Sequence, residues 1–560
     1  MDPNSVEGLE AELKANPFDP NSFARPDQAK VTHLHLKLAV DFTKHILAGH
    51  VLLDVDRVAA NASKLLLDTV DLKIFDIKLV SGGKTTSLNF THHKSVPEFG
   101  AKLEVDISKA TEKKIQIEVL YETVPSARAL QWLAPEQTDG KKYPFVFSQN
   151  EAINARSMVP CQDTPSVKCT YTAEIEAPQY ATVLMSAKIS KPPTAAAGKA
   201  DHHVHHFNQS VPIPSYLIAL VAGDLVSQKL GPRSHVWSER GLINRSAWEF
   251  EQVDMILKTA ESIAGPYVFE VYDLLILPPS FPFGGMENPC LTFVTPTLLA
   301  GDRSLVYVVA HEIAHSWTGN LVTNANFEHF WLNEGFTTFL ERKIAGKIGQ
   351  GEPTRHFNAL EGLKDLKETI KAMGEKNQLT RLVTDLRGVN PDDAFSVVPY
   401  EKGHSFLFYL EQLLGGPTVF EPFLRAYIQH YKYQSIKTED FKRFLVEYFS
   451  KTEEGKKKVA AINWDGWLNT PGLPLVMPQY DTSLLNVSVH LAEKWVQVPE
   501  EQIKTGNGPF NFEEFHALTS GQKKLFLIEL DERTEGKRLS ATKLERLTAV
   551  YKLREEKNAE

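Results

Sequence analysis

The pattern of hydrophobic and polar residues changes along the chain. Over residues 31–41, and again near 50–55, 114–119 and 170–176, the two kinds alternate. Alternation with a period of two is typical of β-strands with one buried face. Turn residues such as those at 81–84 separate these stretches. The pattern predicts a mainly antiparallel β domain over residues 1–223, in which the first 30 or so form a polar, proline-rich arm or loop.

Helical periodicity replaces this alternation after residue 223. It appears near residues 248–263, around residue 311, and in the hydrophobic run 406–414, which ends at the helix-stop signal Gly415-Gly416-Pro417. We predict a mixed α/β domain over residues 224–467 and a proline-rich linker over 468–480. Amphipathic stretches near 482–496, 511–533 and 539–556 predict a C-terminal helical domain over residues 481–560.

Composition excludes several classes of protein. A chain of 560 residues is too long for one hydrophobic core, so we expect a multidomain α+β protein. The net charge of −9 gives no electrostatic reason to expect nucleic acid. The sequence contains no run of eighteen apolar residues, so we expect no membrane span. Cysteine is sparse, being limited to Cys161, Cys169 and Cys290, and the N-terminus does not resemble a signal peptide, which predicts a cytoplasmic protein.

The clearest chemical signal is His311-Glu312-Ile313-Ala314-His315, an H-E-x-x-H motif. On a helix, the two histidines lie one turn apart on the same face and can bind one metal ion. Glu312 lies beside them as a candidate general base. Glu334 follows after eighteen intervening residues and can supply a third ligand. Two His and one Glu, with a position left for water, form the ligand set of a catalytic zinc site, so we predict one Zn²⁺ per chain.

Two histidine-rich segments also fit simpler structures. The alternative for residues 311–315 is an exposed helix with two incidental histidines. The hydrophobic residues 303–310 indicate instead that the pair becomes buried, where a His–Glu–His cluster without a metal would be costly. The segment 202–206 contains four histidines, but a strand would place them on opposite faces. We therefore expect a solvent-facing strand or loop there.

Two further segments contain candidate functional residues. Gly284 and Gly285 allow a backbone to approach a ligand closely, and Glu287 follows among apolar residues. A turn with an exposed Glu is the simpler interpretation of this segment. Tyr400 can donate a hydrogen bond to an oxyanion. Nothing in the sequence alone places Tyr400 near the metal, and packing in a core is its simpler role.

Taken in order, these segments resemble the zinc aminopeptidases with a G-x-M-E-N motif, and more narrowly the leukotriene A4 hydrolase family. The resemblance implies a β domain, a thermolysin-like zinc domain and a solenoid-like C-terminal helical domain. The residues that carry it are Gly284-Gly285-Met286-Glu287-Asn288, His311 to His315, Trp331-Leu332-Asn333-Glu334-Gly335, Tyr400, and the longer stretches 160–168, 278–296 and 315–324.

The resemblance implies a role for each matching residue. His311, His315 and Glu334 bind zinc, while Glu312 activates water, whose pKa the metal lowers. Tyr400 supports the oxyanion. Glu287 holds the free α-ammonium of the substrate, so that cleavage starts at the N-terminus. The other substrate-binding residues that the resemblance implies are Gln149, Glu151, Gly284, Gly285, Met286, Asn288 and Asp392.

This sequence departs from the family pattern in several places. Glu151 stands where the family usually has Gln, which favours a cationic amine and therefore peptides. Phe283 and Phe395 replace the usual Tyr residues, which weakens the expectation of a lipid substrate. In the family, the helical domain continues past the point that matches Glu560 and supplies an Arg and a Lys for the substrate carboxylate. We therefore expect a truncated C-terminal domain, and the sequence assigns that role to no residue.

The sequence thus predicts a monomeric, cytoplasmic zinc aminopeptidase, a metalloprotease that acts on short peptides. A second expectation is a role in leukotriene biosynthesis through hydrolysis of the lipid epoxide leukotriene A4, in which Asp392 directs the water. A third is a catalytically weakened or non-catalytic truncated form that acts as a binding or regulatory protein. We expect neither nucleic acid nor a membrane as a partner.

Overall fold

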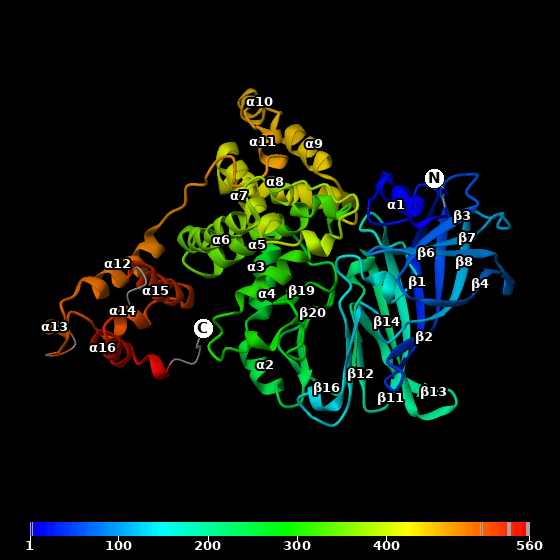
Figure 1. Ribbon diagram of the computed structural model, residues 1–560, viewed down its shortest axis with the longest axis horizontal. Helices are drawn as coiled ribbons and strands as arrows, with labels where there is room; N and C mark the ends of the chain where they lie inside the picture. The colour runs from blue at the N-terminus through cyan, green and yellow to red at the C-terminus, as the bar shows by residue number, and fades with distance from the viewer. Residues whose placement is uncertain (1, 3, 505, 507, 535–538, 556–560) are drawn as a thin grey trace.

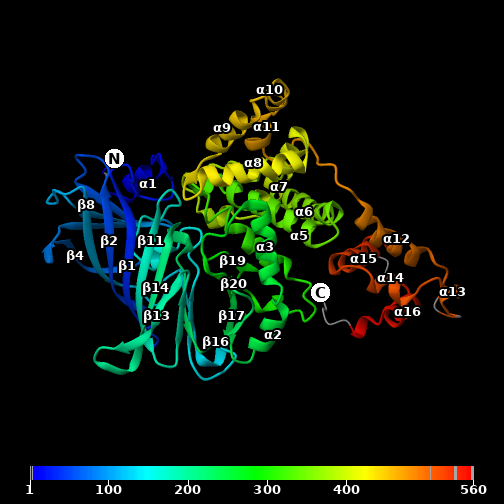
Figure 2. The ribbon, with the colours of Figure 1, turned by 180° about the vertical axis from the view of Figure 1, so that it is seen from behind.

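The computed structural model describes residues 2, 4–504, 506, 508–534 and 539–555. β-sheets form the N-terminal part, a small sheet covered by helices forms the middle, and helices at the end of an extended linker form the C-terminal part (Figures 1 and 2). This arrangement confirms the predicted multidomain α+β class. No helix in the described part of the chain is both long and apolar enough to cross a membrane.

The largest sheet has eight strands in the order β13-β14-β11-β1-β2-β8-β4-β5. Its neighbouring strands are antiparallel except β1 and β11, which are parallel. All four alternating stretches of the sequence lie in these strands, so the predicted mainly antiparallel sheet is confirmed. The strands are β1 (Ala29–Asp41), β2 (Ile46–Arg57), β4 (Lys73–Ser81), β5 (Lys84–Ser87), β8 (Lys114–Glu122), β11 (Lys168–Pro178), β13 (Lys188–Ala196) and β14 (Lys199–Pro214).

Two smaller sheets accompany the large one. One has three strands in the order β3-β7-β6, and the other has four in the order β12-β15-β10-β9. The chain leaves β10 at Ser148 and passes directly into the segment that contains Gln149 and Glu151. These strands are β3 (Lys64–Thr69), β6 (Phe90–Val96), β7 (Gly100–Asp106), β9 (Leu130–Leu133), β10 (Phe145–Ser148), β12 (Thr182–Met185) and β15 (Leu220–Gly223).

Two stretches of the β domain depart from the predicted pattern. The expected N-terminal arm contains a helix, α1 (Val6–Lys14), because Leu9 and Leu13 lie one turn apart and both are buried. The histidine-rich segment does lie on a strand, β14, but His205 and His206 are buried rather than solvent-facing. His206 Nε2 lies 2.9 Å from Thr194 Oγ1 of the neighbouring strand β13, a cross-strand partner that the pattern of this segment alone does not reveal.

A mixed five-stranded sheet organises the middle of the chain. Its order is β16-β17-β18-β20-β19, so β19 is an edge strand. The strands are β16 (Leu225–Lys229), β17 (His235–Glu239), β18 (Asp273–Ile276), β19 (Gly285–Met286) and β20 (Leu291–Val294). A short parallel pair, β21 (Thr323–Asn324) and β22 (Ser435–Ile436), joins two later loops.

Helices pack around this sheet and above it (Figure 1). The predicted helix over 406–414 is the second half of α7, which ends before Gly415. The helices are α2 (Ile243–Glu249), α3 (Val253–Ala264), α4 (Tyr307–His315), α5 (Trp331–Ile348), α6 (Glu352–Met373), α7 (Val398–Leu414), α8 (Pro417–Tyr431), α9 (Thr438–Phe449), α10 (Glu453–Ala460) and α11 (Trp464–Leu468).

The C-terminal helices form a cluster with a core of its own. Residues 469–482 contain no helix or strand and run as an extended linker to this cluster (Figure 2). Trp495, Phe526 and Tyr551 are completely buried within it. The helices are α12 (Ser483–Gln497), α13 (Glu500–Lys504), α14 (Phe512–His516), α15 (Ser520–Arg533) and α16 (Ala541–Tyr551).

The prediction of a single helix over residues 511–533 is wrong, because two helices, α14 and α15, occupy this range. Thr519 interrupts it, because its side chain accepts a hydrogen bond from the Gln522 backbone and caps a new helix. The short helix α13 was also not predicted. Its five residues give too brief a pattern for periodicity to detect.

Candidate active site

Helix α4 places the two motif histidines side by side. His311 and His315 are one turn apart, and their Nε2 atoms lie 3.0 Å from each other. His315 is buried, whereas the His311 side chain keeps 16% of its exposure and faces a cavity. His311 and His315 therefore lie on the same face of one helix, as the spacing of the motif predicts.

Helix α5 brings a carboxylate to the same point. Glu334 Oε2 lies 3.3 Å from His311 Nε2 and 3.4 Å from His315 Nε2. The ligand atoms of these three residues all lie within 4.8 Å of one another, which makes them a group able to hold a metal ion. A second such group, Glu287, Glu312 and His315, overlaps it at His315.

The outer nitrogens of both imidazoles fix their tautomers. His315 Nδ1 lies 3.1 Å from the Thr318 carbonyl oxygen, and His311 Nδ1 lies 2.9 Å from Glu341 Oε2. Both oxygens can only accept, so each Nδ1 donates and each neutral ring turns an Nε2 lone pair inward. Two lone pairs and the Glu334 carboxylate then face one another in a buried place. A cation removes this repulsion, so the donor set fits a metal ion.

The electrostatics of the site lead to the same conclusion. Burial lowers the pKa of His315, but Glu287 and Glu334 outweigh that effect and raise it to about 9. Burial raises the pKa of Glu334, but the neighbouring histidines outweigh that effect and lower it to about 2. Both shifts show that this centre favours an added positive charge.

Glu312 lies on the same helix and faces the strand β19. It is buried, and burial raises its pKa to about 8, against the lowering effect of the two histidines. A Cβ atom added to Gly285 would lie 2.3 Å from Glu312 Oε1. Glycine at 285 is therefore required for this carboxylate to pack against the strand. At Gly284 an added Cβ would meet only Val308 Cγ1, at an ordinary 3.7 Å.

Two more carboxylates line the cavity, and one oxygen of each accepts no hydrogen bond from the described residues. These oxygens, Oε1 of Glu287 and Oε1 of Glu151, are both buried. Burial raises the pKa of Glu151 well above its usual value, and the charge of Glu287 raises it further. Burial also raises the pKa of Glu287. A cation between the two carboxylates would relieve both costs.

Tyr400 lies in the first turn of α7, and Asp392 lies in the segment that leads into this helix. The Tyr400 ring stacks on His311 with centroids 5.9 Å apart, which places the phenol beside the histidine pair. Burial, followed by the charge of Glu334, raises the pKa of Tyr400, so the phenol keeps its proton. Asp392 Oδ1 accepts from the Ala152 backbone and Oδ2 accepts from Asn154 Nδ2, both at 3.4 Å.

One cavity of about 640 Å³ connects these groups. This volume is usual for a small-ligand site. The sequence-predicted residues in its wall are His311, His315, Glu334, Glu312, Tyr400, Gln149, Glu151, Gly284, Gly285, Met286, Glu287 and Asp392. Asn288 is buried and is not among the residues that line the cavity.

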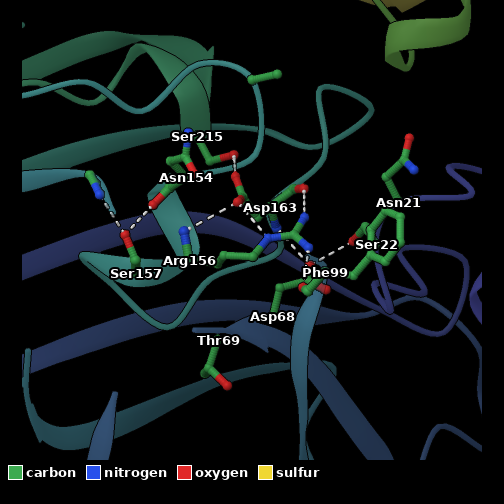
Figure 3. Close-up of polar contacts among 12 residues, drawn as sticks. Asn21, Ser22, Asp68, Thr69, Phe99, Asn154, Arg156, Ser157, Asp163 and Ser215 are labelled. Carbon is green, nitrogen blue, oxygen red and sulfur yellow. Dashed lines mark hydrogen bonds and ion pairs between the residues drawn. The ribbon is translucent and has the colours of Figure 1, made fainter. Parts of the chain in front are cut away.

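A buried polar cluster supports the wall segment that contains Glu151 (Figure 3). Arg156 Nε donates to Asp163 Oδ2 at 2.8 Å, and both side chains are almost fully buried. Arg156 Nη1 also donates to the Phe99 carbonyl at 2.7 Å, and Ser157 Oγ donates to the Asn154 carbonyl at 2.8 Å. These bonds fix the backbone just after Glu151.

Sequence reasoning missed several residues that shape the site. Glu341 fixes the tautomer of His311, and its position two helical turns after Glu334 was a signal that could have revealed it. Gly403 could not have been found, because its role is to let α7 approach α5. A Cβ added to Gly335 would lie 2.8 Å from Gly403 Cα. This close crossing brings the first turns of the two helices, with Glu334 and Tyr400, to one cavity.

Comparison with known proteins identifies the family. The Peptidase M1 N-terminal domain matches residues 30–217, and the Peptidase family M1 domain matches residues 248–467. Leukotriene A-4 hydrolase of Xenopus laevis is 46% identical over 544 residues, covering 97% of this chain and 87% of that protein. Leucine aminopeptidase 2 of Yarrowia lipolytica is 42% identical over 531 residues, covering 93% and 78%.

A solved structure agrees with these sequence matches. The native yeast LTA4 hydrolase aligns with a TM-score of 0.89 and 37% identity, covering 97% of this chain and 86% of that one. The match spans the β domain, the zinc-motif region and the described C-terminal helices. With both family models matched and relatives similar over nearly the whole chain, the protein belongs to peptidase family M1.

Proposed function

We propose that this chain is a zinc-dependent aminopeptidase that removes N-terminal residues from short peptides. One observation carries the proposal: Glu151 and Glu287, each with a buried carboxylate oxygen that accepts no hydrogen bond among the described residues, lie in the same cavity as the His–His–Glu group. A site for an ammonium group thus adjoins a hydrolytic centre. The M1 family implies zinc as the metal.

His311, His315 and Glu334 would hold the zinc ion. When bound, zinc supplies Lewis acidity, which polarises a carbonyl oxygen and lowers the pKa of water. Glu341 and Thr318 keep the two imidazoles in the tautomers that metal binding needs. One ion per chain remains a prediction.

Each of the other residues of the site has a separate role in hydrolysis. Glu312 takes the proton from the attacking water, acting as general base. The phenol of Tyr400 donates a hydrogen bond to the carbonyl oxygen as negative charge develops on it. Glu287 and Glu151 hold the α-ammonium, which places the first peptide bond at the reacting groups. Among the described residues β19 is the last strand of its sheet, and a peptide backbone can pair along the outer side of such an edge strand.

Glu312→Gln tests the central assignment. We expect hydrolysis of an N-terminal aminoacyl amide to fall by about 100-fold to 10,000-fold, the usual contribution of a general base. Metal analysis should show unchanged zinc, because Glu312 is not among the three proposed ligands. Full turnover in the variant would exclude Glu312 as the base.

A matched substrate pair tests the exopeptidase assignment. The wild-type protein should hydrolyse the free amine substrate and leave its N-acetylated analogue intact, because acetylation removes the charge that Glu287 and Glu151 are proposed to hold. Chelation of the metal should stop the reaction. Equal hydrolysis of both substrates would contradict the ammonium site.

Epoxide hydrolysis of leukotriene A4 is the second candidate function. Asp392 lies in the cavity wall, as this activity requires, and the Xenopus laevis relative is named leukotriene A-4 hydrolase. The acidic Glu151 favours an amine over a lipid at the same end of the cavity. Incubation with the epoxide, followed by analysis for a dihydroxy acid, distinguishes the aminopeptidase from the epoxide hydrolase function. Absence of that product would exclude the second activity.

The non-catalytic alternative is not favoured, because the groups needed for hydrolysis converge in one cavity. Other expectations remain predictions. These are the domain boundaries near residues 223, 467 and 480, the cytoplasmic location and the monomeric state.

A further inference from the structure

The N-terminal arm contains a buried loop that contacts both the β domain and the wall of the catalytic cavity. Three polar residues of this loop, Asp19, Asn21 and Ser22, are completely buried. Loops normally keep their polar groups in solvent, and buried polar groups need hydrogen-bond partners. The partners of this loop therefore show which parts of the molecule it joins.

On one side the loop is attached to the β domain. Ser22 Oγ donates to Asp68 Oδ2 at 2.6 Å (Figure 3), and the Phe23 backbone N–H donates to Asp68 Oδ1 at 2.8 Å. Asp68 Oδ2 also accepts from the backbone of Asp163, a member of the buried cluster that supports the wall segment with Glu151. The loop is therefore held by the same cluster as that wall.

On its other side the loop contacts a turn in the cavity wall. The Asn21 Nδ2 group donates to the carbonyls of Leu386 and Val389, both at 3.0 Å. These two residues are the first and last of the turn, which is closed by a bond from the Val389 backbone N–H to the Leu386 carbonyl at 3.1 Å. Gly388, with a φ of +79°, provides the positive φ that such a turn requires. Asn21 thus holds both ends of the turn through one amide group.

The turn leads into a residue that joins the two walls of the cavity. Leu386 itself lines the cavity, and Asp392 follows Val389 after two intervening residues. Asp392 Oδ1 accepts from the backbone of Ala152, which is adjacent to Glu151. The contacts form a closed ring, because the loop holds the turn, the turn carries the aspartate, the aspartate meets the β-domain wall, and the β domain holds the loop.

Only the donor half of the Asn21 amide is used. Its Nδ2 group makes both bonds to the turn, whereas its Oδ1 has no hydrogen-bond partner among the described residues. The reverse orientation would place an oxygen against two carbonyl oxygens, which cannot donate. Donation to the turn is therefore the contribution of this side chain, and space filling alone does not require an amide.

We propose that Asn21 is a positioning residue, which holds the 386–389 turn and so fixes the Asp392 segment against the wall that contains Glu151. This inference rests on the proposed aminopeptidase function and extends it to a residue that does not line the cavity. Because Asn21 acts on the shape of the cavity and lies away from the reacting groups, its loss weakens the capture of substrate more than the chemical step.

Asn21→Ala tests the proposal with the substrate alanine p-nitroanilide. We expect KM to rise by about 3-fold to 10-fold, the net worth of a buried hydrogen bond, while kcat stays within about 2-fold of the wild-type value. Hydrogen exchange in the 386–392 segment should become faster, because the turn loses its support. Zinc content should not change.

Two variants separate donation from packing and from the general stability of the arm. Asn21→Asp keeps the size of the side chain but places a carboxylate against two carbonyl oxygens, so KM should rise further than in Asn21→Ala. A residue that only filled space would show the opposite order. Asn16→Ala is the matched control, because Asn16 Nδ2 also donates to two carbonyls, those of Ser22 at 2.7 Å and Ala24 at 3.0 Å, but both lie within the arm. It should lower stability without raising KM.

Gly388→Ala disturbs the same turn while leaving Asn21 intact, so it also serves if the Asn21 variants fail to fold. The positive φ of Gly388 is unfavourable for alanine, and an added Cβ would lie 2.6 Å from Cε of Lys14 at the end of α1. The same rise in KM, with kcat nearly unchanged, is expected.

The outcomes separate this inference from the proposed function. A rise in KM confined to the Asn21 and Gly388 variants supports the positioning role. Equal rises in Asn21→Ala and Asn16→Ala, a milder effect of Asn21→Asp than of Asn21→Ala, or a loss of kcat at unchanged KM overturns it and leaves the aminopeptidase function in place. A wild-type protein that does not hydrolyse the substrate with zinc bound contradicts the aminopeptidase function. Hydrogen exchange then decides the role of Asn21 by itself, since unchanged exchange of the 386–392 segment in Asn21→Ala would overturn that role.

Discussion

At the scale of single residues, contact between a glycine and a carboxylate sets the position of the proposed base. Gly285 lies so close to Glu312 that any side chain at 285 would have to displace the carboxylate. Position 285 therefore requires glycine because a larger residue would clash with Glu312. At position 284 an added Cβ would make only an ordinary van der Waals contact. Neither glycine lies in the left-handed region of backbone conformations, so conformational freedom does not explain them.

Gly285→Ala should lower kcat/KM on a peptide substrate by about 100-fold, as expected when a catalytic group moves by about 1 Å. Gly284→Ala should cause a much smaller loss, because its added methyl group meets only Val308 at a normal distance. Steady-state kinetics on both variants, with zinc content measured in parallel, check this. Equal losses in the two variants would show that Glu312 is not what the glycine accommodates.

At the scale of elements, the crossing of α5 and α7 builds much of the site. Gly335 on α5 faces Gly403 on α7 closely enough for the two backbones to touch. The same two helices are joined nearby by an ion pair between Arg342 and Glu401 at 2.7 Å. Because Glu334 precedes Gly335 and Tyr400 precedes Gly403 by less than one turn, the closeness of the helices sets the distance between these two functional groups.

Gly403→Ala should push the helices apart, destabilise the protein by about 1–3 kcal/mol and lower activity together. Gly346→Ala is the control, because it crowds the far end of α5 against Gly351 rather than the site. We expect that variant to lose stability without a comparable loss of kcat. Thermal unfolding and kinetics on the two proteins test this, and a fully active Gly403→Ala would contradict it.

At the scale of the whole molecule, a buried lysine joins the β domain to the zinc-motif region. Lys168, at the start of β11, donates from Nζ to the carbonyls of Asn320 and Leu321, both at 2.9 Å. Asn320 in turn donates to the Glu287 carbonyl at 2.7 Å. The β domain therefore supports the loop behind His315 and the proposed ammonium site through one side chain.

This lysine predicts a pH dependence of stability. Burial lowers the pKa of Lys168 from 10.5 to about 7, so between those values the unfolded chain binds more protons than the folded one. Stability from this group must then rise with pH, by at most about 1.4 kcal/mol per unit. We expect the melting temperature of the wild type to rise between pH 7 and about 9.5 relative to Lys168→Met, which cannot titrate. A constant difference across that range would refute the prediction.

Local patterns predicted the elements well and the site in part. The alternation at 31–41 and the run at 406–414 became β1 and most of α7, because their neighbours in sequence are also their neighbours in space. The pattern failed at α1 and at the break before α15, where two leucines or one capping threonine decide the structure. It also failed for His205 and His206, which are buried on β14 within the large sheet.

The sequence by itself determined that His311 and His315 share a helix face and that a carboxylate follows them, because helix geometry is local. Only the tertiary structure decided which other groups join them. Glu151, from the β domain, meets Glu287 and Asp392 in one cavity, and Arg381, whose Nε has no hydrogen-bond partner among the described residues, lies in its wall. Such contacts join residues far apart in the chain, and they depend on how sheets and helices pack rather than on any spacing along the sequence.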